Sequence, residues 1–198
     1  MSKNNKFSEK MSKLITDLAD TLKGRDLREF KPIYLINETT VAKKHEDEFD
    51  AANEFRWGRF LLGQGINVPE MFELLGPEQL IPEVDQEIAR QVESRKLWFL
   101  LMERIKGKDF FDMSGEDRTE ALRQFRVQLE RILERGILPR DCGYGRNYLF
   151  NREQQKLYFL DFAYWREAED KSELTEYRKL VGNPSRLWDE FNYGLNYL

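Results

Sequence analysis

The stretch Leu-Tyr-Phe-Leu-Asp-Phe-Ala at residues 157–163 is the most informative part of the sequence for the fold. Its first four residues are apolar, which matches the length and composition of a buried strand. Asp161 follows directly, and a carboxylate at the end of a buried strand can bind a hard cation that bridges phosphate oxygens. The same pattern also fits an aspartate that hydrogen-bonds within a turn. The role of Asp161 therefore depends on what the rest of the chain offers.

The chain has the size and composition of a globular protein. Its 198 residues suit one domain or two joined lobes, and 40% of them are hydrophobic. The 32 basic and 36 acidic residues are interspersed and give a net charge of -4. Neither a basic field for nucleic acid nor a membrane-binding surface is therefore expected.

Cysteine and histidine each occur once, as Cys142 and His45. A single cysteine excludes an internal disulfide, and one histidine excludes both a Cys/His metal cluster and a conventional Ser-His triad. Carboxylates, lysines and backbone amides remain as the abundant chemical groups. Neither a signal peptide nor an apolar run of membrane-spanning length is apparent, so a cytoplasmic location is expected.

The first half of the chain predicts a mixture of helices and strands. Apolar spacing favours helices over residues 8–23 and 46–62. Strand-like runs cover residues 33–36, 40–44, 68–75 and 97–102, the first two joined through Asn37 and Glu38. Residues 76–96 carry only a weak apolar stripe and are predicted to be an exposed insertion. The positions expected to be buried in the second helix include Phe49, Ala52, Phe60 and Leu61.

The second half predicts a mainly helical part with an inserted hairpin. Ser114 can cap a helix over residues 115–135. Residues 147–150 and 157–160 form the predicted hairpin, and short helices are expected over residues 172–181 and 184–197. The order of elements predicts an α+β protein.

This order resembles the protein-kinase-like fold over residues 40–165, and the similarity is greatest to the small RIO-type kinases and the small kinase of the KEOPS complex. The aminoglycoside phosphotransferases are larger relatives. Asp161-Phe162-Ala163 resembles the D-F-G motif, whose aspartate holds magnesium on the nucleotide phosphates. The resemblance implies ATP and Mg²⁺ as the bound nucleotide and metal, and it makes Asp161 a metal ligand.

Residues 138–147, Leu-Pro-Arg-Asp-Cys-Gly-Tyr-Gly-Arg-Asn, resemble the catalytic-loop motif H-R-D-x4-N. The resemblance places Asp141 beside the acceptor hydroxyl and makes Asn147 the second metal ligand. Pro139 replaces the histidine, and the spacing from Asp141 to Asn147 is one residue longer than in the motif. An Arg-Asp pair with only a structural role in a loop is the alternative.

Val-Ala-Lys-Lys at residues 41–44 resembles V-A-I-K, whose lysine pairs with the nucleotide phosphates and with a helix glutamate. Strand alternation places Ala42 and Lys44 on one face, which favours Lys44 over Lys43 as this catalytic and phosphate-binding lysine. Glu54 is the matching glutamate. A surface lysine pair and a solvated glutamate are the alternative.

Residues 101–107 resemble the hinge of the family, where adenine hydrogen-bonds to backbone groups around Glu103 and Ile105. The implied architecture is a minimal bilobal kinase-like fold with a small antiparallel sheet lobe, residues 1–103, and a mainly helical lobe, residues 104–198. The family's glycine-rich loop is missing before Val41, and no A-P-E motif follows Asp161.

Three functions stay open at this stage. The first is an atypical small kinase that transfers the γ-phosphate of ATP to a hydroxyl acceptor, which the sequence does not identify. The second is a pseudokinase or nucleotide-binding regulatory module that acts through a protein partner. The third is an unrelated interaction protein that uses the aromatic residues near its C-terminal end, residues 187–193.

Overall fold

The computed structural model describes residues 3–29, 32–140 and 145–181. The chain divides into two compact units. The first comprises Met1–Phe55 and Met71–Arg104, and the second comprises Arg56–Glu70 and Ile105–Leu198. The lobe boundary expected at residue 103 stays a prediction, and each unit is described by itself.

The first unit is built on an antiparallel sheet with the strand order β1-β2-β4-β3. Its strands are β1 (Ile33–Asn37), β2 (Thr40–His45), β3 (Met71–Leu75) and β4 (Trp98–Glu103). The continuous apolar run predicted as a buried strand is β4, which lies inside the sheet with neighbours on both edges. The β1–β2 hairpin has the predicted turn, where Asn37 Oδ1 accepts a 3.0 Å hydrogen bond from Thr39 N.

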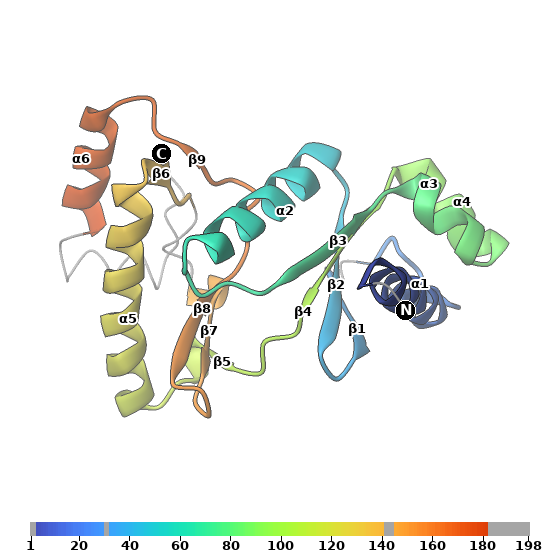
Figure 1. The fold of residues 1–198 in the computed structure, drawn as a ribbon, viewed down its shortest axis with the longest axis horizontal. Helices are drawn as coiled ribbons and strands as arrows, with labels where there is room; N and C mark the ends of the chain where they lie inside the picture. Colours follow the sequence, from blue (N-terminus) through green and yellow to red (C-terminus); the bar gives the residue numbers. More distant parts are fainter. Residues whose placement is uncertain (1–2, 30–31, 141–144, 182–198) are drawn as a thin grey trace. The chain divides into compact units, whose positions relative to one another are not determined.

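One face of this sheet packs against helices (Figure 1). These are α1 (Lys3–Leu22), the short α3 (Pro77–Leu80) and α4 (Gln86–Arg95). Leu18 of α1, Leu80 of α3 and Ile88 of α4 are buried in one core cluster with Ala42 and Phe99 of the sheet. Asp85 caps α4 by accepting a hydrogen bond from Ile88 N.

The prediction that residues 76–96 form an exposed insertion is wrong for their apolar side chains. Leu80, Ile88 and Val92 are at most 1% exposed. The stripe looked weak because polar residues fill the outer faces of two short helices, while the few apolar ones contact α1 and the sheet. The segment is part of the core of the first unit.

Helix α2 (Glu48–Gly63) buries a different face from the one predicted. Its buried stripe consists of Ala51, Glu54, Trp57, Gly58 and Leu61, which follow helical spacing. Of the predicted positions Leu61 is buried, but Phe49 and Phe60 are 74% and 43% exposed, and Ala52 is exposed too. Counting apolar residues missed this face because a charged residue, Glu54, occupies its centre.

The second unit joins helices to small sheets. Ser114 caps α5 (Gly115–Glu134), as predicted, by accepting from Asp117 N. The predicted hairpin consists of β7 (Tyr148–Asn151) and β8 (Lys156–Phe159). The other strands of the second unit are β5 (Lys108–Asp109), β6 (Ile137–Leu138) and β9 (Arg166–Glu167). Strand β5 pairs with β7, and β6 pairs with β9.

An aromatic cluster forms the core of the second unit. Phe125 of α5 packs edge to face on Tyr148 at 5.1 Å and stacks on Phe159 at 5.6 Å between ring centres. The last described element of the unit is α6 (Lys171–Val181), as predicted, whereas the helix predicted over residues 184–197 lies outside the described residues. In the described ranges no helix has the length and apolar character needed to cross a membrane. The small antiparallel sheets and helices confirm the α+β prediction.

Candidate functional site

A buried ion pair joins the sheet of the first unit to α2. Lys43 Nζ donates a 2.7 Å hydrogen bond to Glu54 Oε2. The Glu54 side chain is 1% exposed and the Lys43 side chain 14%. Charged side chains are rarely this buried unless a partner compensates the loss of hydration. Their position follows from strand alternation, because Ala42 points into the core beside α1 and Lys43 points to the opposite face.

His45 is a third member of this buried group. It follows Lys43 by two residues, so both side chains lie on the same face of β2. Its Nε2 lies 3.2 Å from Glu54 Oε2, within ion-pair distance but outside hydrogen-bond geometry. Sequence reasoning gave His45 no role, although the same alternation that relates Ala42 to Lys44 relates Lys43 to His45.

The electrostatics of the group favour an ionised glutamate. Burial raises the pKa of the Glu54 carboxyl, but Lys43 and His45 lower it by more, so the pKa lies below its usual range. Glu54 is therefore a carboxylate at neutral pH and can hold the Lys43 ammonium in one position.

Lys44 has a different environment from Lys43. Its Nζ donates to two backbone carbonyls, those of Leu27 at 2.7 Å and Glu29 at 3.1 Å. Burial lowers the pKa of Lys44. The expected pairing of Lys44 with Glu54 is wrong, because Lys44 points to the α1 side of the sheet and fixes the segment that precedes β1.

An apolar surface lies on the same face of the sheet as Lys43. Ile33 is opposite Lys43 in the β1–β2 register and Leu35 is opposite Val41, and paired residues share a face. Ile33 and Leu35 are 40% and 51% exposed. A planar apolar group could rest on this surface, at low cost in desolvation.

The expected hinge residues lie where β4 ends. Glu103 is opposite Thr40 in the β2–β4 register, and the next residue, Arg104, donates its N–H to Thr39 O at 2.8 Å. Glu103 and Ile105 are both half-buried. Their contact with adenine stays a prediction.

Asp161 and Asn147 are brought together in the second unit. The carbonyl of Asn147 accepts a 2.8 Å hydrogen bond from Leu160 N, so its backbone lies beside the residue that precedes Asp161. Asp161 has a φ of 60°, which is uncommon for a residue other than glycine and concentrates at functional sites. The next residue, Phe162, is fully buried and packs edge to face on Trp165, with 5.0 Å between ring centres.

These two residues supply oxygen donors of the kind that Mg²⁺ prefers. The described residues contain no cluster of three or more His, Cys, Asp or Glu side chains that could hold a metal by themselves. The role of Asp161 and Asn147 as metal ligands stays a prediction.

Asp141, the expected catalytic residue, lies outside the described residues. The chain that leads to it is firmly held, since Ile137 and Leu138 of β6 are buried and pair with β9. Tyr177 Oη of α6 also donates a buried 2.6 Å hydrogen bond to Pro139 O.

The structure is similar to several solved structures. It matches WaaP, solved in complex with acyl carrier protein, with a TM-score of 0.50 and 13% identity, and the match covers 89% of each chain. It matches the kinase PK-1 of Cydia pomonella granulovirus with a TM-score of 0.50 and 17% identity, over 79% of this chain and 57% of the viral one. The Rio2 kinase of Chaetomium thermophilum, solved as an ADP/Mg²⁺-phosphoaspartate complex, gives a TM-score of 0.46 and 14% identity.

The match to the Rio2 kinase covers 76% of this chain, and the chain spans only 40% of that protein's length. No protein-family model matches the chain, and no curated protein is significantly similar to it in sequence. At these identities the likeness concerns the fold.

Proposed function

The chain has a protein-kinase-like fold, as its sequence predicted, and on this premise we propose that it is an ATP- and Mg²⁺-dependent phosphotransferase that transfers the γ-phosphate to a hydroxyl acceptor. The observation that carries this proposal is the buried pair of Lys43 and Glu54. Phosphoryl transfer in this fold depends on placing charge at the phosphates, and a lysine held by a helix glutamate is one of its recurring parts.

Lys43 is the residue proposed to bind the phosphates, in place of Lys44. An ammonium on a flexible stem is oriented only when a partner fixes it, and Glu54 does this at 2.7 Å. His45 adds to the fixation by its contact with the same carboxylate oxygen. A lysine oriented in this way loses little freedom on binding an anion, which favours affinity.

The adenine is proposed to lie on the exposed apolar surface of Ile33 and Leu35. Backbone groups at Glu103 and Ile105 would provide its hydrogen bonds. No glycine-rich loop precedes β2, so its backbone amides are not available to bind the phosphates. Phosphate binding would therefore depend more on Lys43 and on the metal than it does in kinases that have this loop.

Asp161 and Asn147 are the proposed ligands of Mg²⁺. When bound, the metal would neutralise charge on the β- and γ-phosphates. Asp141 would orient the acceptor hydroxyl or accept its proton. A protein partner is also proposed, because the similar WaaP was solved together with acyl carrier protein.

Turnover of γ-labelled ATP tests the reaction without knowledge of the acceptor, because release of phosphate to water can be measured directly. The wild-type chain should convert ATP slowly to ADP, and Asp141→Asn should abolish this while leaving stabilisation by ATP and Mg²⁺ in a melting assay. Turnover that survives Asp141→Asn would contradict the proposal. Stabilisation without any turnover in the wild type would instead support a nucleotide-binding regulatory module.

A further inference from the structure

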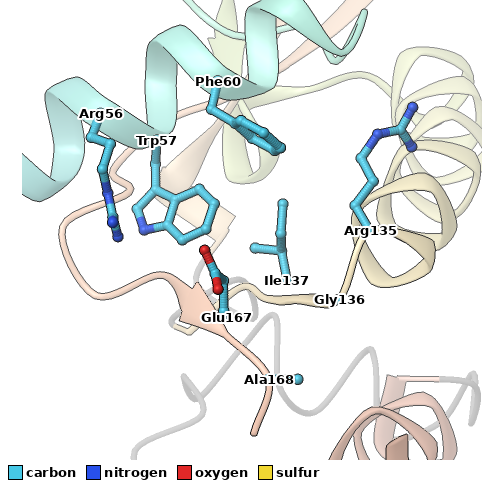
Figure 2. Close-up of a pocket in the computed structure, with 8 residues that line it drawn as sticks. All are labelled: Arg56, Trp57, Phe60, Arg135, Gly136, Ile137, Glu167 and Ala168. Atoms are coloured by element: carbon cyan, nitrogen blue, oxygen red, sulfur yellow. The ribbon is translucent and has the colours of Figure 1, made fainter. Parts of the chain in front are cut away.

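The second unit contains a pocket that the proposed phosphotransfer does not use (Figure 2). Its volume is about 350 Å³, near the lower end of the range of roughly 300–1,000 Å³ for ligand sites. Trp57 and Phe60 of α2 and Ile137 of β6 form its apolar walls, and Arg56, Arg135 and Glu167 add charge, with the Arg56 guanidinium 4.9 Å from the centre of the Trp57 ring. A pocket of this size suits one large side chain better than an extended ligand.

The apolar walls are fixed in the folded unit. Trp57 Nε1 donates a buried 2.6 Å hydrogen bond to Trp165 O, which leaves the indole ring a single orientation. Phe60 meets this ring edge to face, with 5.8 Å between ring centres. Ile137 is 1% exposed and pairs with Glu167 across β6 and β9. A ligand would therefore enter a preformed site, with little cost for ordering the protein.

Of the three charged residues at the pocket, Arg135 and Glu167 have no oppositely charged partner among the described residues. Arg135 donates to neutral acceptors, Gln64 Oε1 at 2.9 Å and Arg131 O at 2.6 Å, and no carboxylate of the described residues lies within ion-pair distance. The Glu167 carboxylate also has no ion pair or hydrogen bond with any of the described residues. In the view of Figure 2 the two side chains lie on opposite sides of Ile137.

The composition indicates a protein as the occupant. Aromatic side chains and arginine are enriched where proteins bind one another, around pockets that receive an anchoring side chain. Phe60 is 43% exposed at the rim, as such a surface requires. A simple anion would complement Arg135 but leave Glu167 facing a like charge, and a simple cation would complement Glu167 but be repelled by Arg56 and Arg135.

We propose that this pocket binds a segment of a partner protein that inserts one apolar side chain against Trp57, Phe60 and Ile137, with an acidic residue on the Arg135 side and a basic residue on the Glu167 side. The proposal concerns only the second unit and does not depend on nucleotide binding or phosphotransfer.

Selection from a displayed library of random linear peptides tests the proposal with the full chain as bait. The wild type should enrich peptides that carry an apolar residue between an acidic and a basic one. With Arg135→Glu as bait, the enriched peptides should carry a basic residue in place of the acidic one. With Glu167→Lys as bait, they should carry an acidic residue in place of the basic one. Arg126→Glu, on an exposed part of α5 outside the pocket, should leave the selected sequences unchanged.

The selected peptides also report where they bind. A wild-type peptide should quench or shift tryptophan fluorescence, and Phe60→Ala should weaken its binding by about tenfold or more, since truncation of a pocket aromatic typically costs over 1.4 kcal/mol. Phe60 is 43% exposed, so this variant should lower the melting temperature only slightly and remain folded. Failure to enrich any peptide would overturn the proposal, as would enriched sequences that neither charge reversal changes.

Discussion

Lys43 Nζ lies 2.7 Å from Glu54 Oε2, whereas the ammonium of the next residue, Lys44, donates to backbone carbonyls on the opposite side of the sheet. Two adjacent lysines in one strand therefore have separate tasks. Lys43 belongs to a buried charged group with Glu54 and His45, and Lys44 fixes the segment before β1. This division allows the functional and structural contributions of the two lysines to be measured separately.

Breaking the buried pair should destabilise the first unit strongly. Lys43→Met leaves the Glu54 carboxylate buried without its main partner, which typically costs about 3–5 kcal/mol. The free energy of unfolding in urea measures this loss. Lys43→Met combined with Glu54→Leu should recover much of it, because an apolar pair replaces the ionic one. A double variant as unstable as the sum of the single ones would contradict this account of the pair.

Lowering the pH should remove the contribution of the ionised Glu54 side chain to the free energy of unfolding. The pKa of Glu54 is lower in the folded chain than its ordinary value of 4.5, so its contribution is fully present above that value. The contribution is lost as the pH falls through the lower pKa of the folded state. Urea unfolding at a series of pH values should therefore show a steep loss below pH 4.5 that is absent in Glu54→Gln.

Glu120→Gln provides the control for this titration. The hydrogen bond from Arg123 lowers the pKa of Glu120 to about 2, but the carboxylate lies near the surface, where solvent screens the pair. We expect this variant to follow the wild-type pH dependence more closely than Glu54→Gln does. Equal effects of the two substitutions would show that Glu54 has no special role.

Lys44→Met should lower stability without abolishing nucleotide binding. The substitution removes a donor to the carbonyls of Leu27 and Glu29, and an unsatisfied buried acceptor costs about 1–3 kcal/mol. Arg95 also donates to Leu27 O at 3.2 Å, which should limit the loss. A melting assay with and without ATP and Mg²⁺ should show a lower melting temperature and an unchanged nucleotide-dependent shift. Loss of that shift would assign the phosphate-binding role to Lys44.

The sequence predicted the order of helices and strands better than it predicted the directions of side chains. The Asn37 turn, the Ser114 cap and the apolar run of β4 determine local structure by themselves, and all three were predicted. Alternation along β2 separates Lys43 from Lys44 but does not say on which face α2 lies. That choice depends on packing, since α1 and α4 occupy the Ala42 face.

The buried face of α2 was mispredicted for a related reason. Phe49 and Phe60 are more apolar than Glu54, yet Glu54 is buried because Lys43 compensates its charge. Such compensation arises only when strand and helix come together, so a pattern of hydrophobicity cannot predict it. Asp141 lies outside the described residues, and its role remains as the sequence suggested it.

Asp161→Asn should weaken the binding of Mg²⁺ together with the nucleotide. Asparagine tolerates the φ of 60° found at this position, so the backbone should keep its conformation while the carboxylate is lost. We expect the apparent affinity for Mg²⁺, measured by titration at a fixed ATP concentration, to fall about tenfold or more. Asn147→Ala should weaken it less, because a neutral amide oxygen binds a cation more weakly than a carboxylate does. Unchanged Mg²⁺ dependence in Asp161→Asn would exclude Asp161 as a ligand.

Calorimetric titration of ATP with Mg²⁺ into the wild-type chain, Lys43→Met and Lys44→Met measures which lysine binds the phosphates. We expect saturable binding to the wild type and to Lys44→Met, and binding weakened about tenfold or more in Lys43→Met, because the latter lacks the oriented ammonium. No heat of binding to the folded wild type at millimolar ATP would contradict the account. A Lys43→Met variant that stays folded and binds ATP as tightly as the wild type would contradict the phosphate-binding role of Lys43.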